Sequence, residues 1–356
     1  MKRSGIALLN ACGAASAART LQGRRVTILT YHGVIGGTSD YEYLNHNFIS
    51  AESFDAQMRY VAEHYQPIAL HELVRFYREG RTPPRRSLAV TFDDGFANNF
   101  TVAFPILRRH RVPFTVFVTT SLLDVRGELL WTDRAKRALY LCTRTSVVLP
   151  LDGIDVALDL SSPAARVNAC RDVLGRMKRL PPAMRQAALQ TVDGVCGRPP
   201  IEEHERERYE FLSWQQVKQM AEAGVEFGSH TVSHPILATL DSDALDMELT
   251  RSKQRIEAML QRECYALAYP NGSPADFGVR EKTALRQTGY LCGLSLKGTL
   301  NDRPDLFELD RVNVGRHLDM PSFQLAITGV LGTARRTRDW FARSVRSAVG
   351  KRRRAS

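Results

Sequence analysis

Residues 88–96 read LAVTFDDGF, an apolar run that ends in two adjacent carboxylates, Asp93 and Asp94, and a glycine. Buried strands of parallel sheets have this apolar, β-branched composition. In parallel α/β folds, catalytic side chains lie at the carboxyl ends of the strands, on the loops that lead into helices. Two neighbouring carboxylates repel each other, so at neutral pH either one takes up a proton or a cation neutralises the pair. The stretch therefore predicts a parallel sheet with a site at its edge.

Six further runs of this kind alternate with segments of helical periodicity. Ser53 and Ser213 are expected to cap two of the intervening helices, and Gly224 to end the second of them. A strand followed by a helix, repeated about seven times, favours a parallel sheet closed as a barrel, with an open doubly wound sheet as the alternative. The seven expected strands cover residues 26–32, 87–92, 114–120, 225–230, 265–270, 290–296 and 310–314.

One interval breaks this rhythm, because roughly a hundred residues separate the third and fourth expected strands, more than an ordinary crossover contains. Within it, residues 131–142, 162–180 and 181–197 have helical patterns, and residues 146–160 resemble a β-hairpin with an Asp-Gly turn. We therefore expect an inserted, mainly helical subdomain at about 121–212. Since it leaves the barrel at the carboxyl end of a strand, it is expected to cover one side of the site and to help select the substrate.

The net charge of +11 is concentrated at the carboxyl terminus. Residues 335–356 form a basic tail with a net charge of +8, which leaves +3 for the rest of the 356 residues. Apolar side chains alternate with arginines there at roughly helical spacing, a pattern of helices that bind anionic membrane surfaces. A solvated, frayed terminus is the alternative. No nucleic-acid partner is expected, because no recognition motif accompanies the charge.

The amino-terminal segment, residues 1–25, is expected to be helical rather than an export signal. Its unbroken apolar run spans only residues 6–9, whereas a secretory signal needs about 7–15 apolar residues. No run of about 18 apolar residues predicts a transmembrane helix. The six cysteines are scattered, without CxxC pairs, which indicates free thiols in a reducing compartment. The expected location is the cytoplasm, with peripheral contact at the inner membrane through the tail.

Metal ligands are expected beside the two aspartates. His230 and His234 lie four residues apart in FGSHTVSHPIL (227–237), at the end of the fourth expected strand. Pro235 disfavours helical conformation at His234, so the pair is expected on a turn. Two histidines and one carboxylate with a water form a common catalytic zinc set. An isolated HxxxH pattern is weak evidence, but at the same edge of the sheet as two aspartates it predicts a metal site.

A third motif, AYPNG (268–272), ends the fifth expected strand. Together with TFDDG (91–95) and SHTVSHP (229–235), it resembles the polysaccharide deacetylase family, also called carbohydrate esterase family 4. The resemblance covers residues 26–120 and 225–316. It implies a distorted (β/α)7 barrel that removes N-acetyl, or less often O-acetyl, groups from a bacterial polysaccharide or lipid-linked glycan. It also implies a divalent metal, with Zn²⁺ the favoured ion. The barrel domain is assigned to residues 26–334.

The resemblance also implies roles for single residues. Carried over by position, Asp93 is the general base, and a metal-bound water is the nucleophile. The metal ligands are Asp94, His230 and His234. Separate roles for the base and the metal ligands suit amide hydrolysis, because an amide is a poor electrophile that needs both carbonyl polarisation and a base. The backbone N–H of Asn271 is implied as the oxyanion donor.

Other parts of the family pattern are altered. No arginine precedes the third motif, so Arg311 is a candidate to orient Asp93 in its place. His317, in LDRVNVGRHLDM, is a candidate general acid. His32, at the end of the first expected strand, is a candidate to line the site. A surface or structural role is the alternative for each. Two other functions stay open, namely an inactive glycan-binding relative and a metal-dependent hydrolase of a non-sugar amide.

Overall fold

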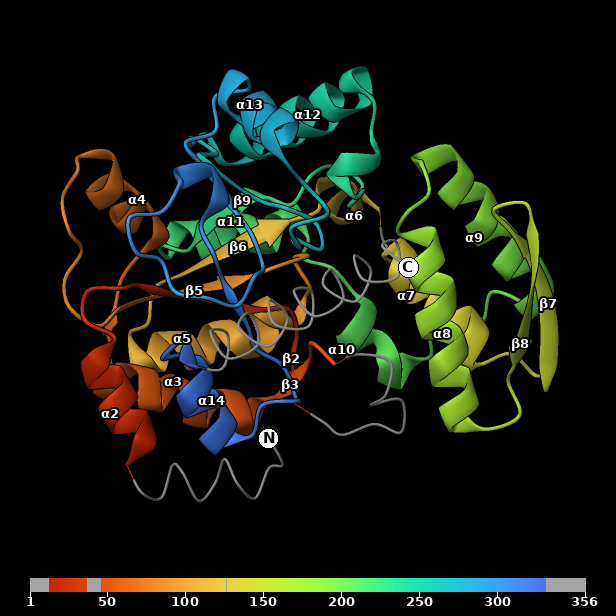
Figure 1. The fold of residues 1–356 in the computed structure, drawn as a ribbon, viewed down its shortest axis with the longest axis horizontal. Coiled ribbons are helices and arrows are strands. Elements are labelled where there is room, and N and C mark those ends of the chain that lie inside the picture. Colours follow the sequence, from red (N-terminus) through yellow and green to blue (C-terminus); the bar gives the residue numbers. More distant parts are fainter. Residues whose placement is uncertain (1–12, 37–45, 126, 331–356) are drawn as a thin grey trace, which may run out of the picture.

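The computed structural model describes residues 13–36, 46–125 and 127–330, and its centre is a curled parallel sheet surrounded by helices (Figure 1). All seven expected strands are present, and every neighbouring pair is parallel. A short strand, β4 (Gln66–Pro67), is added beside β5. In spatial order the seven strands are β11 (Cys292–Leu294), β10 (Ala266–Ala268), β9 (Glu226–Ser229), β6 (Phe114–Val118), β5 (Ser87–Phe92), β1 (Thr27–Tyr31) and β12 (Val312–Asn313).

The two ends of the sheet meet. A parallel bridge joins Leu294 of β11 to Leu309, just ahead of β12. The N–H of Ser295 donates to the carbonyl of Leu309 at 2.7 Å, and the N–H of Leu309 donates to the carbonyl of Gly293 at 2.9 Å. The sheet therefore closes into a distorted barrel. The expected barrel is confirmed, and the open doubly wound alternative is excluded.

Helices cover the outer face of the sheet (Figure 1). Two-residue strands β2 (Val34–Ile35) and β3 (Ile49–Ser50) form a separate pair.

No helix among the described residues is long and apolar enough to cross a membrane. The helices outside the insertion are α2 (Ala14–Leu21), α3 (Ala51–His64), α4 (Leu70–Arg78), α5 (Phe104–His110), α11 (Trp214–Glu222), α12 (Ser242–Leu260), α13 (Val279–Gln287), α14 (Met320–Ala326) and the short turns η1 (Asn99–Ala103), η3 (Leu237–Thr239) and η4 (Leu306–Glu308).

The two expected serine caps have different outcomes. Ser213 caps α11 as predicted, and Gln216 completes a capping box, because its Oε1 accepts a hydrogen bond from the Ser213 N–H at 2.9 Å. The expected cap at Ser53 is wrong. Ser50, which is extended, caps α3, because its side chain accepts a hydrogen bond from the N–H of Ser53 at 3.2 Å. Either serine satisfies the sequence rule, and only the backbone conformation distinguishes them.

The inserted segment between β6 and α11 forms a second packed unit at one side of the barrel (Figure 1). Asp152 and Gly153, with φ of 53° and 75°, make the expected turn of its hairpin. Its core contains Leu139, Leu149 and Val173 and is distinct from the barrel core. The elements of this segment are α6 (Thr120–Asp124), α7 (Trp131–Tyr140), β7 (Ser146–Leu151), β8 (Ile154–Asp159), α8 (Pro163–Met177), α9 (Pro182–Cys196), η2 (Glu203–Glu205) and α10 (Arg206–Tyr209).

Side chains alternate between the two faces of the barrel strands. Val116 and Val118 of β6 belong to the cluster packed beneath the surrounding helices, whereas Phe117 belongs to a second cluster with Ala89 and Ala266. We infer that the second cluster fills the barrel interior. Its small residues leave room for the Phe117 ring, which is fully buried.

We expect Gly228→Ala to lower the free energy of unfolding by about 1–3 kcal/mol through overpacking. A Cβ at Gly228 would lie 2.5 Å from the Phe117 ring and 2.9 Å from the Ala266 carbonyl. Urea denaturation measures the change. Gly194→Ala is the matched control, because nothing lies within 4 Å of its Cβ in α9, and it should raise stability by about 0.5–1 kcal/mol. Equal effects of the two variants would contradict the packing of β9 against Phe117.

Candidate active site

A tight turn separates the two aspartates at the end of β5. The N–H of Asp93 continues the pairing with β1 by donating to the Tyr31 carbonyl at 2.9 Å. The N–H of Gly95 then donates back to the Asp93 carbonyl at 2.9 Å, with Asp94 between them at φ 72°. Such a three-residue turn, with positive φ at its centre, is a strained γ-turn. It lets neighbouring carboxylates reach different partners.

Asp93 is held by a buried arginine. Arg311 donates from both terminal nitrogens to the two carboxylate oxygens of Asp93, at 2.6 and 2.8 Å. Neither side chain is more than 4% exposed. Burial by itself raises the pKa of Asp93, but the charge and hydrogen bonds of Arg311 outweigh it and hold that pKa at about 2. The contact expected between these residues is present, and Asp93 is an ionised carboxylate at neutral pH.

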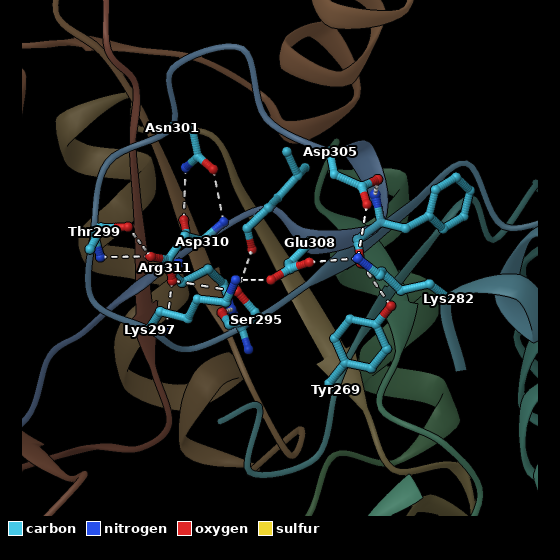
Figure 2. A network of polar contacts seen from close by, with 12 residues as sticks. Tyr269, Lys282, Ser295, Lys297, Thr299, Asn301, Asp305, Glu308, Asp310 and Arg311 are labelled. Atoms are coloured by element: carbon cyan, nitrogen blue, oxygen red, sulfur yellow. Dashed lines mark hydrogen bonds and ion pairs between the residues drawn. The ribbon is translucent and has the colours of Figure 1, made fainter. Parts of the chain in front are cut away.

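A polar network fixes Arg311 in turn (Figure 2). The Arg311 Nε donates to the Ser295 carbonyl at 3.1 Å, and the guanidinium lies over the Phe117 ring at 5.6 Å. The preceding Asp310 accepts hydrogen bonds from the N–H groups of Lys297 and Thr299 at 2.6 and 2.8 Å. These contacts wrap the loop after β11 around Asp310. Arg311 therefore has little freedom to leave Asp93.

The second aspartate faces two histidines. Nε2 of His230 lies 3.5 Å, and Nε2 of His234 lies 3.4 Å, from Asp94 Oδ1. Nδ1 of His230 lies 2.8 Å from the Ala268 carbonyl, which can only accept, so Nδ1 carries the proton and Nε2 keeps its lone pair. The carbonyl of His234 accepts from the Trp131 indole at 3.2 Å. The three ligand atoms offered by these residues lie within 4.8 Å of one another.

This arrangement fits a divalent metal. Asp94 Oδ1 is buried without a hydrogen-bond partner among the described residues. Burial and the nearby Asp93 raise the pKa of Asp94, and burial lowers the pKa values of His230 and His234. Three groups with unshared lone pairs thus surround one point. Bonds of about 2.0–2.1 Å at a tetrahedral angle separate two ligands by about 3.3–3.4 Å, close to the two distances from Asp94 Oδ1. The three residues can therefore hold such an ion.

A cavity of about 170 Å³ contains these groups, and the insertion forms part of its wall. Leu130, Trp131 and Asp133 line it from the start of α7, and Leu174 and Lys178 from the end of α8. The insertion thus lies beside the site, as expected, and not at the opposite end of the barrel. The sequence did not single out these wall residues, since nothing in a helical pattern marks which turn will face a cavity.

The remaining predicted residues divide into two groups. Asn271 and His32 line the cavity, and the backbone N–H of Asn271 has no acceptor among the described residues. Burial lowers the pKa of His32 to about 4, although the charge of Asp93 opposes this change. His317 is exposed in the turn after β12 and is not part of the cavity wall. The structure therefore does not bring His317 to the site.

Backbone strain is concentrated around the cavity. Among the described non-glycine residues, nine have positive φ. Four of them belong to the motif loops, namely Asp94, Thr231, His234 and Asn271, with φ between 56° and 72°. Each such residue costs about 1 kcal/mol or more and persists only where surrounding contacts enforce it. The clustering supports a functional site here.

Fold and site together define an α/β-barrel hydrolase with a candidate metal centre. The sequence profile of polysaccharide deacetylases matches residues 80–139 and 177–292. The chain belongs to the polysaccharide deacetylase family, a group of hydrolases that act on carbon–nitrogen bonds other than peptide bonds.

Individual relatives are distant. YxkH of Bacillus subtilis (strain 168) is 19% identical over 307 residues, which are 86% of this chain and 77% of that protein. The poly-β-1,6-N-acetyl-D-glucosamine N-deacetylase of Escherichia coli (strain K12) is 26% identical over 101 residues, 28% of this chain and 15% of that protein. The structure of the Streptococcus pyogenes deacetylase PplD in complex with acetate has a TM-score of 0.57 at 19% identity, covering 85% of this chain and 98% of that one. The structural likeness supports the fold.

We expect Arg311→Met to move the acid limb of the pH–rate profile to higher pH. The low pKa of Asp93 depends on Arg311, so without it burial raises that pKa and the carboxylate protonates at higher pH. An unpaired buried carboxylate should also lower stability by about 3–5 kcal/mol. Profiles of kcat/KM against pH measure the shift.

Arg311→Lys keeps the charge without the paired hydrogen bonds, so it should fold more stably and show a smaller shift in the same direction. Arg251→Met, at an exposed position of α12, is the control and should leave the profile unchanged. If both Arg311 variants kept the wild-type acid limb, Arg311 would not set the protonation of Asp93.

Proposed function

We propose that this protein is a metal-dependent deacetylase that hydrolyses N-acetyl groups of a bacterial polysaccharide or lipid-linked glycan. The observation that carries the proposal is the division between neighbouring carboxylates in one cavity. Asp93 is ionised and paired with Arg311, while Asp94 and two histidines surround a point suited to a cation. Amide hydrolysis needs a base and an electrophilic centre side by side, and this cavity has a carboxylate for the first and a candidate set of metal ligands for the second.

Asp93 is the proposed general base. Its pairing with Arg311 fixes the carboxylate in place and keeps it unprotonated, so it can accept a proton from the attacking water. A base with so low a pKa is weak. Its strength in this role therefore comes from position, since a held carboxylate avoids the entropic cost of a bimolecular encounter.

Asp94, His230 and His234 are the proposed metal ligands. A divalent ion bound there would polarise the acetyl carbonyl and acidify a water. Zn²⁺ is the proposed ion, because two histidines and one carboxylate form a common catalytic zinc set. The backbone N–H of Asn271 is the proposed donor to the oxyanion that develops on the carbonyl oxygen. Its lack of an acceptor among the described residues supports this role.

His32 is the proposed proton donor to the leaving amine, in place of His317. Asn47 lies between His32 and Asn313: its Oδ1 accepts from the Asn313 amide at 3.2 Å, and its Nδ2 lies 3.4 Å from His32 Nε2. This arrangement leaves the proton on His32 Nδ1, which is buried without a partner among the described residues. The low pKa keeps this ring neutral at rest, so it takes up the proton that the more acidic Asp93 has removed from the water, and the charged ring then gives that proton to the amine.

An acetylated amino sugar is the proposed substrate. The family assignment and the E. coli relative, named for acting on poly-β-1,6-N-acetyl-D-glucosamine, support this choice. We propose that the insertion helps to select the glycan, because its side chains form part of the cavity wall. The basic tail, residues 335–356, lies outside the described residues. Its contact with an anionic membrane at the cytoplasmic side stays a prediction.

We expect that alanine at Asp94, His230 or His234 removes tightly bound metal and abolishes turnover, since three protein ligands leave little redundancy. Asp93→Asn should retain about one metal per chain, because it is not a ligand, while turnover falls about 10²–10⁴-fold. Metal stoichiometry and deacetylation of N-acetylglucosamine oligomers should be measured on all four variants side by side.

Cyclic and linear amides belong in the same screen. Turnover of these amides but not of the oligomers would replace the sugar substrate with another amide, and metal binding without any turnover would leave an inactive glycan-binding relative. An Asp93→Asn protein that loses its metal while Asp94→Ala keeps it would reverse the roles of the two aspartates.

A further inference from the structure

Lys178 connects the insertion to the loop that carries Asn271. It caps the carboxyl end of α8, where the helix dipole favours a positive charge. Its side chain lines the cavity, and its ammonium group donates to Asn271 Oδ1 at 2.6 Å. Burial lowers the pKa of Lys178, and the charge of Asp276 partly offsets this effect. A partly desolvated ammonium group requires hydrogen-bond acceptors, so this contact is a strong one.

The Asn271 side chain lies between a cation and an anion. Opposite Lys178, its Nδ2 donates to Asp276 Oδ2 at 2.5 Å. The same carboxylate oxygen accepts from the N–H of Ser273 at 2.7 Å. The amide dipole is thus aligned from Lys178 to Asp276, and each hydrogen bond polarises the next. Both ends of the side chain are fixed.

The backbone of Asn271 needs such support. Asn271 and Gly272 have φ of 62° and 61°, two successive residues in the left-handed region. Asparagine tolerates this conformation at a cost that tertiary contacts must offset. The carbonyl of Gly272 accepts from the N–H of Leu296 at 2.8 Å, which anchors the loop on its far side. On the side of Asn271, the contact from outside the barrel comes from Lys178.

We propose that Lys178 is a positioning residue which, through the Asn271 side chain, holds the Asn271 backbone N–H in place for the developing oxyanion. This inference rests on the proposed deacetylase function. It gives the insertion a part in the rate of the chemical step as well as in substrate contact. Oxyanion donors act only when fixed near the position of the developing charge, so a displaced loop lowers kcat rather than binding.

Lys178→Met should lower kcat roughly tenfold and leave KM and metal content near wild type, a smaller loss than the about 10²–10³-fold effect of removing an oxyanion donor outright. Lys178→Arg, which keeps the charge and the donors, should restore most of the rate. Arg179→Met is the matched control, because Arg179 is the exposed neighbour, and it should behave as wild type. In an Asn271→Gly background, Lys178→Met should have no further effect, since its target side chain is gone.

Hydrogen exchange supplies a readout that does not need activity. Backbone amides of residues 271–273, 275 and 276 should exchange faster in Lys178→Met than in the wild type and at wild-type rates in Arg179→Met. A raised KM with unchanged kcat would make Lys178 a substrate-binding residue and overturn the proposal, as would unchanged exchange. If the wild type deacetylates nothing, the proposed function fails. Faster exchange in Lys178→Met would then still support the contact between Lys178 and Asn271, and unchanged exchange would contradict its role in holding the loop.

Discussion

The buried pair between Arg311 and Asp93 constrains the rest of the site. It joins β12 to the end of β5 through the barrel, with the guanidinium above the Phe117 ring. An ionised carboxylate this deeply buried is unstable without a partner, and breaking such a pair typically costs about 3–5 kcal/mol. The barrel must therefore close with β12 beside β1. Small interior residues such as Ala89 and Gly228 allow that closure around one aromatic ring.

Because Arg311 neutralises Asp93, Asp94 can interact with different partners. The strained turn at Asp94 directs that carboxylate toward His230 and His234. Without this separation, two adjacent acids would share one proton or one ion. The strain at the motif loops is thus the cost of giving neighbouring groups different roles. It is offset by strand pairing and by contacts from outside the barrel, including the Trp131 indole on the His234 carbonyl.

Much of the fold and of the candidate site could be predicted from the sequence. Fully buried parallel strands such as β5 and β6 consist of continuous apolar runs, so their existence and order were evident. Asp93, Asp94, His230 and His234 follow strands directly, and parallel topology brings strand ends together. The cap of α3 was misplaced because Ser50 and Ser53 both fit the capping rule. The sequence offered His317 as a candidate general acid and did not single out Lys178, since a turn and a helix end are placed by tertiary packing rather than by local pattern.

The central claim is that one aspartate serves a metal and the other serves a base. The most direct measurement is a crystal structure of the zinc-loaded protein, with anomalous diffraction recorded at the zinc absorption edge. We expect one strong anomalous peak within bonding distance of Asp94, His230 and His234, about 2.0–2.2 Å from each ligand atom. Asp93 should still be paired with Arg311. A zinc ion bound by Asp93, or density that shows Asp93 released from Arg311, would contradict the account.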